Sequence, residues 1–351
     1  MHAAPSPIDW VRAEQVAIAV AARRPAARST LSVDQIASVD VVEAAVEAVT
    51  GLRPAHGPAT VQFVDRPTWI RANLASFRTM LAPLLDRWQQ KLPANGTAAG
   101  FSRQVAGAEM GALLGWMSTR VLGQYDMLVG RSPDDDAVYL VAPNLAAVEH
   151  RYGFDPGEFR TWVMLHELTH RAQFTGVPWM RDHFTSLVDE SLSFADPDPA
   201  ALVTALRSAL RDRRSAGQQV RDGGVMSMLA PPEQRAVMAR IAGLMSLLEG
   251  HGDVTMTRAA GDLVPNADRF ERILRERRRN ANPLSRTVLR LAGIEAKLNQ
   301  YAAGVRFIDA IEGAKGLRVV DRCWERPEHL PSLDEIRQPS LWLERMGTAV
   351  A

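Results

Sequence analysis

Residues 163–171 read Val-Met-Leu-His-Glu-Leu-Thr-His-Arg, and this stretch is the strongest indication of the fold in the sequence. Its histidines, His166 and His170, stand four positions apart, and four helical steps of about 100° bring the second imidazole to within about 40° of the first. Both rings can then reach one metal ion, and Zn²⁺ suits two neutral imidazoles and an oxygen ligand. Glu167 lies one step around the helix, where its carboxylate can take a proton from water at the open coordination position. We therefore expect a zinc site with His166 and His170 as ligands and Glu167 as the general base.

The surroundings of the H-E-x-x-H motif favour a real metal site over a chance match. From ordinary residue frequencies, a chain of this length contains the motif by chance in roughly one case in a hundred. The three residues directly before the motif, and Leu168 and Thr169 at its two variable positions, are uncharged, as in a half-buried helix whose other face packs in a core. Arg171 departs from the uncharged residue that is usual after the second histidine.

The segment Leu248–Asp253, which reads Leu-Glu-Gly-His-Gly-Asp, offers the third ligand that a catalytic zinc site needs. Glu249 and Asp253 again stand four apart at the end of an expected helix. Behind Glu249, on the same face, lie the small residues Ala242 and Ser246, which would let this helix approach the first one closely. We expect Glu249 to bind the metal and Asp253 to accept a hydrogen bond from the far nitrogen of a ligand histidine.

His251 competes with Glu249 for the third position, and Asp253 or another acid is a further alternative. On a continuous helix, two steps put His251 about 200° away from Glu249, so the two cannot easily share a face. If Gly250 and Gly252 let the helix unwind, His251 can instead act in catalysis by donating a hydrogen bond to a developing oxyanion.

Tyr301 is a further catalytic candidate, because its hydroxyl can polarise a substrate carbonyl. It belongs to one of two polar-aromatic clusters, Gln300-Tyr301 and Gln124-Tyr125-Asp126. In such clusters a tyrosine more often only caps a core with its hydroxyl. The other histidines stand alone in the sequence and are interpreted as surface or core residues.

Hydrophobic spacing predicts a mainly α fold with a small β-sheet. Helices are expected at 10–22, 38–50, 67–91, 157–174, 232–256, 268–279, 285–292 and 296–311, and in a segment that sets Gly107, Gly111 and Gly115 four apart. Ala137–Ala142, rich in β-branched and aromatic residues, is expected to form a strand near the metal helix that can pair with an extended peptide. The tail from Pro327 is expected to be irregular.

The chain length allows one large unit or two closely packed lobes. We expect residues 1–351 to form a single unit. Its possible lobes are 1–195, with the H-E-L-T-H helix, and 225–351, with the E-G-H-G-D motif. The polar stretch 211–224 between them, which contains serine, glycine and glutamine, favours a boundary there.

Composition restricts the partners and the compartment. The 41 basic and 40 acidic residues leave a net charge of +1, so no excess field draws the protein to nucleic acid. Cys323 is the only cysteine, which excludes an intramolecular disulfide and fits a reducing compartment. The first residues lack the pattern of a signal peptide, and the most apolar stretch, Val105–Met117, is too short to span a membrane. We expect a cytoplasmic protein without membrane contact, and the sequence leaves its oligomeric state open.

The sequence resembles the zincin-like metallopeptidases of type 2, a largely actinobacterial family often labelled as uncharacterised hydrolases associated with deazaflavin coenzyme biosynthesis. The resemblance covers most of the chain and rests on several separate motifs in the same order. These are Val121–Asp126, Val141–Asn144, His166–Phe174, Leu248–Asp253, Lys297–Tyr301, and Leu330–Ile336 with Trp342. It implies a zincin-like metallohydrolase core with His166, His170 and Glu249 in the metal positions and Glu167 in the catalytic one. Gly252 stands where alanine is expected in this family.

These observations favour a zinc-dependent metallopeptidase that hydrolyses an amide or peptide bond, with Zn²⁺ as cofactor and a peptide or small amide as substrate. The first alternative is a zinc amidase or other hydrolase that acts on a small molecule with the same residues. The second is a non-catalytic, zinc-stabilised binding protein. An intact Glu167 argues against the second alternative, because a structural site needs no base.

Overall fold

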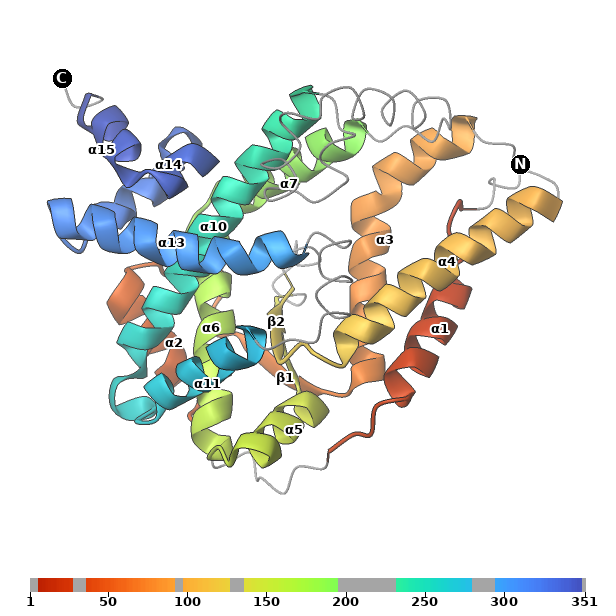
Figure 1. The fold of residues 1–351 in the computed structure, drawn as a ribbon, viewed down its shortest axis with the longest axis horizontal. Coiled ribbons are helices and arrows are strands. Elements are labelled where there is room, and N and C mark those ends of the chain that lie inside the picture. Colours follow the sequence, from red (N-terminus) through yellow and green to blue (C-terminus); the bar gives the residue numbers. More distant parts are fainter. Residues whose placement is uncertain are drawn as a thin grey trace. The chain divides into compact units, whose positions relative to one another are not determined.

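The computed structural model describes residues 6–27, 36–91, 97–126, 136–194, 232–279 and 294–348. Helices dominate this part of the chain, and a small three-stranded sheet accompanies them, which confirms the predicted fold class (Figure 1). The longer helices are α1 (Trp10–Ala22), α2 (Val39–Thr50), α3 (Arg66–Lys91), α4 (Thr97–Ser118), α5 (Ala142–Tyr152), α6 (Pro156–Gly176), α7 (Met180–Ser193), α10 (Pro232–Ala260), α11 (Ala267–Arg279), α13 (Ile294–Lys315) and α15 (Pro339–Thr348). Shorter helical turns are η3 (Gly261–Leu263), η4 (Val319–Trp324), η5 (Pro327–His329) and α14 (Leu333–Arg337).

The sheet has the strand order β1-β3-β2, with β1 (Thr60–Val64), β2 (Gly123–Tyr125) and β3 (Ala137–Val141). β1 runs parallel to β3, and β2 runs antiparallel to it. The predicted strand is therefore confirmed as β3, except that Ala142 already begins α5. Its expected pairing with an extended peptide is wrong, because β1 and β2 occupy both of its edges.

Helix α6, which carries His166 and His170, spans Pro156–Gly176, one residue more at its start and two more at its end than expected. Asp155 precedes it, and the Asp155 carboxylate accepts a hydrogen bond from the Glu158 backbone N–H (2.9 Å), as an N-cap does. Pro156 is the first helical residue, a position where a missing N–H costs nothing. All residues from Phe159 to Thr175 are buried except His166, which is half-buried. The motif thus lies on a helix that is enclosed along most of its length.

Helices α1 and α4 pack backbone to backbone along the three glycines that stand four apart, and Figure 1 shows the two helices side by side. Gly107 faces Asp9, the N-cap residue of α1, and Gly111 and Gly115 face Ala13 and Ala17 within α1. A Cβ added to any of the three glycines would overlap backbone atoms there. The close approach predicted from this spacing is confirmed.

Two other expectations change. The tail from Pro327 is helical, not irregular: α14 begins with a capping box in which Ser332 and Glu335 each bond the backbone N–H of the other, and α15 follows. Helix α10 continues to Ala260, so it does not unwind at Gly250 and Gly252. The helix expected at 285–292 lies outside the described residues.

The chain divides into two compact units. One holds α1, most of α2, the sheet, α3 to α5, α6 as far as Arg171, and residues 259–267. The other holds α6 from Ala172, α7, α10 as far as Arg258, and the helices from α11 onward. The lobe limits predicted at 195 and 225 fall in a part of the chain that the structure does not describe, so they stay predictions. Among the described helices, none is long and apolar enough to cross a bilayer.

We predict that Gly111→Ala lowers the free energy of unfolding by about 1–3 kcal/mol, because the new methyl group meets the backbone of Ala13, which cannot move aside as a flexible side chain can. Gly100→Ala on the same helix is the matched control, since nothing lies within 4 Å of its added Cβ. The control should be stabilised by about 0.5–1 kcal/mol. Urea unfolding of both variants measures the difference, and equal effects would contradict the close packing.

Candidate metal centre

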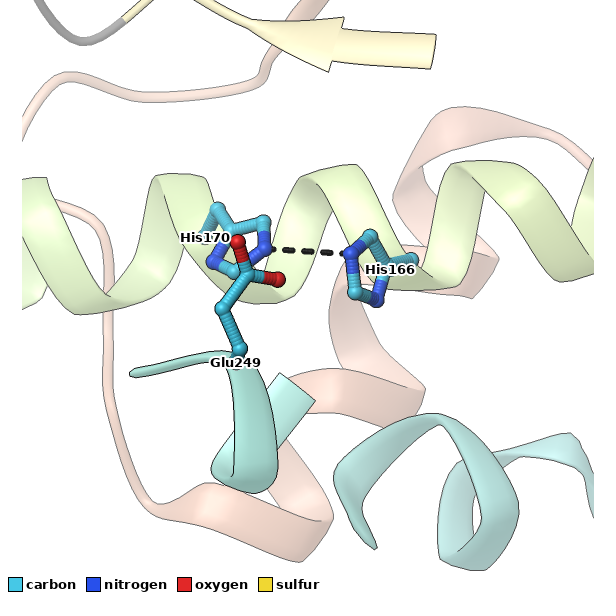
Figure 2. Close-up of side chains that lie close together, drawn as sticks. All are labelled: His166, His170 and Glu249. Carbon is cyan, nitrogen blue, oxygen red and sulfur yellow. Dashed lines mark hydrogen bonds between the residues drawn. The ribbon is translucent and has the colours of Figure 1, made fainter. Parts of the chain in front are cut away.

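His166, His170 and Glu249 lie close together. One ligand atom from each lies within 4.8 Å of the others. The two Nε2 atoms of the histidines are 3.1 Å apart. Figure 2 shows both imidazoles on α6 and the Glu249 carboxylate reaching toward them from α10. His170 and Glu249 are buried, and His166 is half-buried.

This donor set fits a zinc ion. Two nitrogen ligands of a tetrahedral Zn²⁺ are about 3.3 Å apart if each lies about 2.05 Å from the metal. The 3.1 Å between the two Nε2 atoms is close to that value. Two imidazoles and one carboxylate are also the ligand types of a zinc hydrolase site, and a cation offsets the cost of burying the carboxylate charge.

Glu167 lies against the edge strand β2. Its Oε2 accepts a hydrogen bond from the Tyr125 backbone N–H (2.8 Å), and the side chain is buried. Gly123 makes room for this contact, because a Cβ there would lie 2.7 Å from Cγ of Glu167 and 2.9 Å from Cγ1 of Val163. The carboxylate of Glu167, the residue that follows His166 in the sequence, is thus held by backbone from outside its own helix.

Sequence reasoning missed this contact. It grouped Tyr125 with its neighbours as a polar-aromatic cluster and considered only its hydroxyl. The residue contributes through its main chain, which no side-chain pattern reports. Gly123, next to that cluster, was the available signal, because an isolated glycine in a strand often marks a close backbone approach.

Arg171, the residue that departs from the usual motif, is fully buried with three oxygen partners. Its Nε lies 2.7 Å from Oδ2 of Asp136, and its Nη1 lies 2.5 Å from Oε1 of Glu43. A third contact, from Nη2 to the carbonyl oxygen of Gly57, is 2.7 Å long. Desolvation raises the pKa of Glu43, and the charge of Arg171 opposes that shift. Arg171 therefore joins the histidine-bearing helix to α2 and to the residue before β3.

The remaining candidates have different positions. His251 is buried, with its ring against Trp324 (centroids 4.9 Å apart) and its Nδ1 2.9 Å from Nε2 of Gln173. It does not belong to the cluster of ligand atoms. The unwound helix that its oxyanion role required is not present, because α10 is helical throughout this segment. Asp253 is half-buried in α10, and its hydrogen bond to a ligand histidine stays a prediction. Tyr301 lies in α13, but its side chain falls outside the described part of the structure.

The chain is similar to known proteins over nearly its whole length. A family model described as zincin-like metallopeptidase matches residues 8–343. A crystal structure described as a candidate hydrolase with a novel fold, from Chloroflexus aurantiacus, is 31% identical to this chain and superposes with a TM-score of 0.72. The match covers 97% of this chain and 99% of that one. No curated protein is significantly similar.

We predict that the purified protein binds about one zinc ion per chain and that His166→Ala or His170→Ala removes most of it, because two remaining ligands make an inadequate site. Metal analysis after dialysis measures the content. His150→Ala is the matched control, since that histidine is exposed on α5 and should leave the metal content unchanged. Full zinc retention in both ligand variants would refute the site.

We also predict that Glu249→Ala weakens zinc binding far more than His251→Ala does, because only Glu249 has a ligand atom near both histidines. Competition with a chromogenic chelator gives the two dissociation constants. The reverse ranking would assign the third position to His251.

Proposed function

Because the chain belongs to the zincin-like metallopeptidase family, we propose that it is a zinc-dependent hydrolase that cleaves an amide or peptide bond. The observation that carries this proposal is the convergence of His166, His170 and Glu249, with the carboxylate of Glu167 on the same helix. A purely structural metal site would need no such carboxylate beside its ligands.

In this proposal the two histidines and Glu249 hold the ion. A zinc ion bound there supplies a Lewis acid for the substrate carbonyl and makes a water molecule acidic near neutral pH. The buried surroundings of His170 and Glu249 exclude other water and strengthen the electrostatic interactions among these groups.

Glu167 is the proposed general base. Its carboxylate accepts a proton from the attacking water, whose oxygen bonds to the carbonyl carbon, and then passes that proton to the nitrogen as the C–N bond breaks. The Tyr125 N–H holds one carboxylate oxygen through a charge-assisted hydrogen bond, so the base is oriented before substrate arrives. No side chain of the protein has to form a covalent bond with the substrate.

One contact favours a short amide over a long extended peptide as substrate. Peptides commonly bind by adding a strand to a free sheet edge. At β2, the Tyr125 N–H already binds Glu167, so it cannot bind a peptide carbonyl while it holds the base. A small-molecule amidase is therefore the second candidate function.

We predict that Glu167→Gln keeps the zinc and the fold but lowers turnover by about 100-fold to 10,000-fold, because an amide of the same size cannot accept the water proton. The glutamine oxygen can still accept the hydrogen bond from Tyr125. Screening a peptide and amide library with both proteins measures the effect. Glu158→Gln, a half-buried site on the same helix, is the matched control and should keep full turnover.

Two outcomes would overturn parts of this proposal. If the wild type turns over nothing in a broad panel and Glu167→Gln binds the natural partner unchanged, a zinc-stabilised binding protein is the better account. If Glu167→Gln keeps full turnover on an identified substrate, the hydrolase stands but its base lies elsewhere, with Glu190, Asp253 and His251 next to test.

A further inference from the structure

Gln173 is a fully buried polar residue that the proposed reaction does not use. It lies three residues beyond His170 on α6. Its Nε2 is 3.0 Å from the carbonyl oxygen of Leu248 and 2.9 Å from Nδ1 of His251, both on α10. A single amide group of the histidine-bearing helix thus contacts the residue before Glu249 and the second residue after it.

The chemistry of the partners fixes the direction of both hydrogen bonds. A carbonyl oxygen only accepts, so the atom that faces Leu248 must be the amide nitrogen of Gln173. That nitrogen carries two protons, and the second points to His251, whose Nδ1 therefore accepts. The proton of the neutral His251 ring is then on Nε2. Gln173 uses both of its donors on the segment that carries Glu249.

The same segment of α10 is held from its other sides. A Cβ on Gly250 would overlap the backbone of Gly304 in α13, and Figure 1 shows α13 crossing α10. Trp324 packs edge-on against the ring of His251. Gly304 and Trp324 pack against α10 and limit its movement away from these contacts. The two hydrogen bonds from Gln173 then fix the position of α10 along α6.

That place matters for metal binding. One residue along a helix is a rise of about 1.5 Å, whereas metal–ligand distances tolerate only about 0.2 Å. A slide or roll of α10 by a fraction of a residue would therefore carry the Glu249 carboxylate out of reach of an ion held by the histidines. The hydrogen bond from Gln173 to the Leu248 carbonyl holds the backbone right next to Glu249 and so opposes such a movement there.

We propose that Gln173 is a positioning residue that fixes Glu249 relative to the two histidines and so sets the metal affinity and the ligand geometry. This inference rests on the proposed zinc site. Gln173 touches neither metal nor substrate. It acts through the carbonyl of Leu248 and the ring of His251.

The test replaces Gln173 with methionine, which is of similar length and unbranched but has no N–H donor. Zinc and cobalt ions are titrated into the metal-free protein, and the visible absorption of bound cobalt reports the ligand geometry. We expect about 10-fold to 100-fold weaker zinc binding, the usual effect of losing a partner that orients ligands, together with a changed cobalt spectrum. If the methionine variant fails to fold, Gln173→Asn takes its place. Asparagine keeps a buried amide but is too short to reach both acceptors, so this variant should also change the cobalt spectrum.

Trp342→Phe is the matched control. Trp342 is fully buried in the same unit, and the substitution removes its hydrogen bond from Nε1 to the carbonyl oxygen of His329 (2.8 Å), far along the chain from Glu249. It should lower the melting temperature and leave zinc affinity and the cobalt spectrum unchanged. A merely structural role for Gln173 predicts the same result for Gln173→Met as for this control, and that result would overturn the inference. Absence of metal binding in the wild type would instead refute the proposed function itself.

Discussion

The burial of α6 is the constraint on which the rest of the structure depends. From Phe159 to Thr175 this helix is enclosed, and its sequence nevertheless carries several polar side chains. A buried polar group that lacks a partner costs free energy of the order of a whole hydrogen bond or more, so each one dictates what must pack beside it. Glu167 is met by the backbone of β2, Arg171 by two carboxylates, and Gln173 by α10. The position of the helix thus follows from satisfying its polar groups in different directions.

The buried charge of Arg171 illustrates what this arrangement achieves. A buried ion pair contributes little net stability, because desolvation consumes most of the attraction between the charges. Removing one partner is costly, however, since it leaves the other charge buried. Asp136 and Glu43 therefore restrict where α6 can lie more than they strengthen the fold. His170, which precedes Arg171 on the helix, is restricted in position in the same way, and the residues of a metal-binding site need accurate placement.

Backbone-to-backbone helix packing recurs where precision is required. Glycines bring α4 onto α1, and Gly250 brings α10 onto Gly304 of α13. Without side chains at the crossing, two helices have few alternative arrangements, and the residues beside the crossing are fixed with them. Glu249 lies directly beside the second crossing. Gly123 has the same use at the edge of the sheet, where it lets Glu167 reach the main chain.

Local patterns in the sequence were enough for most of the longer helices, though not for α7 and α15, and for the shared face of His166 and His170, because a helical period depends only on near neighbours. They failed for both partners of β3, and the three residues of β2 are too few for a usable alternation. They also failed for α5, whose first residue, Ala142, was assigned to the strand, although the proline that follows it suits the first turn of a helix. The spacing around Glu249 placed it on a suitable face, but His251 remained a rival. Only the tertiary structure decided which of them lies beside the histidines, because that depends on the side of α10 that meets α6. The hydrogen bond from the Tyr125 amide to Glu167 and the two hydrogen bonds of Gln173 could likewise not be predicted from the sequence. Every residue type except proline has the same main-chain donor and acceptor, and packing between distant segments decides which partner each one finds.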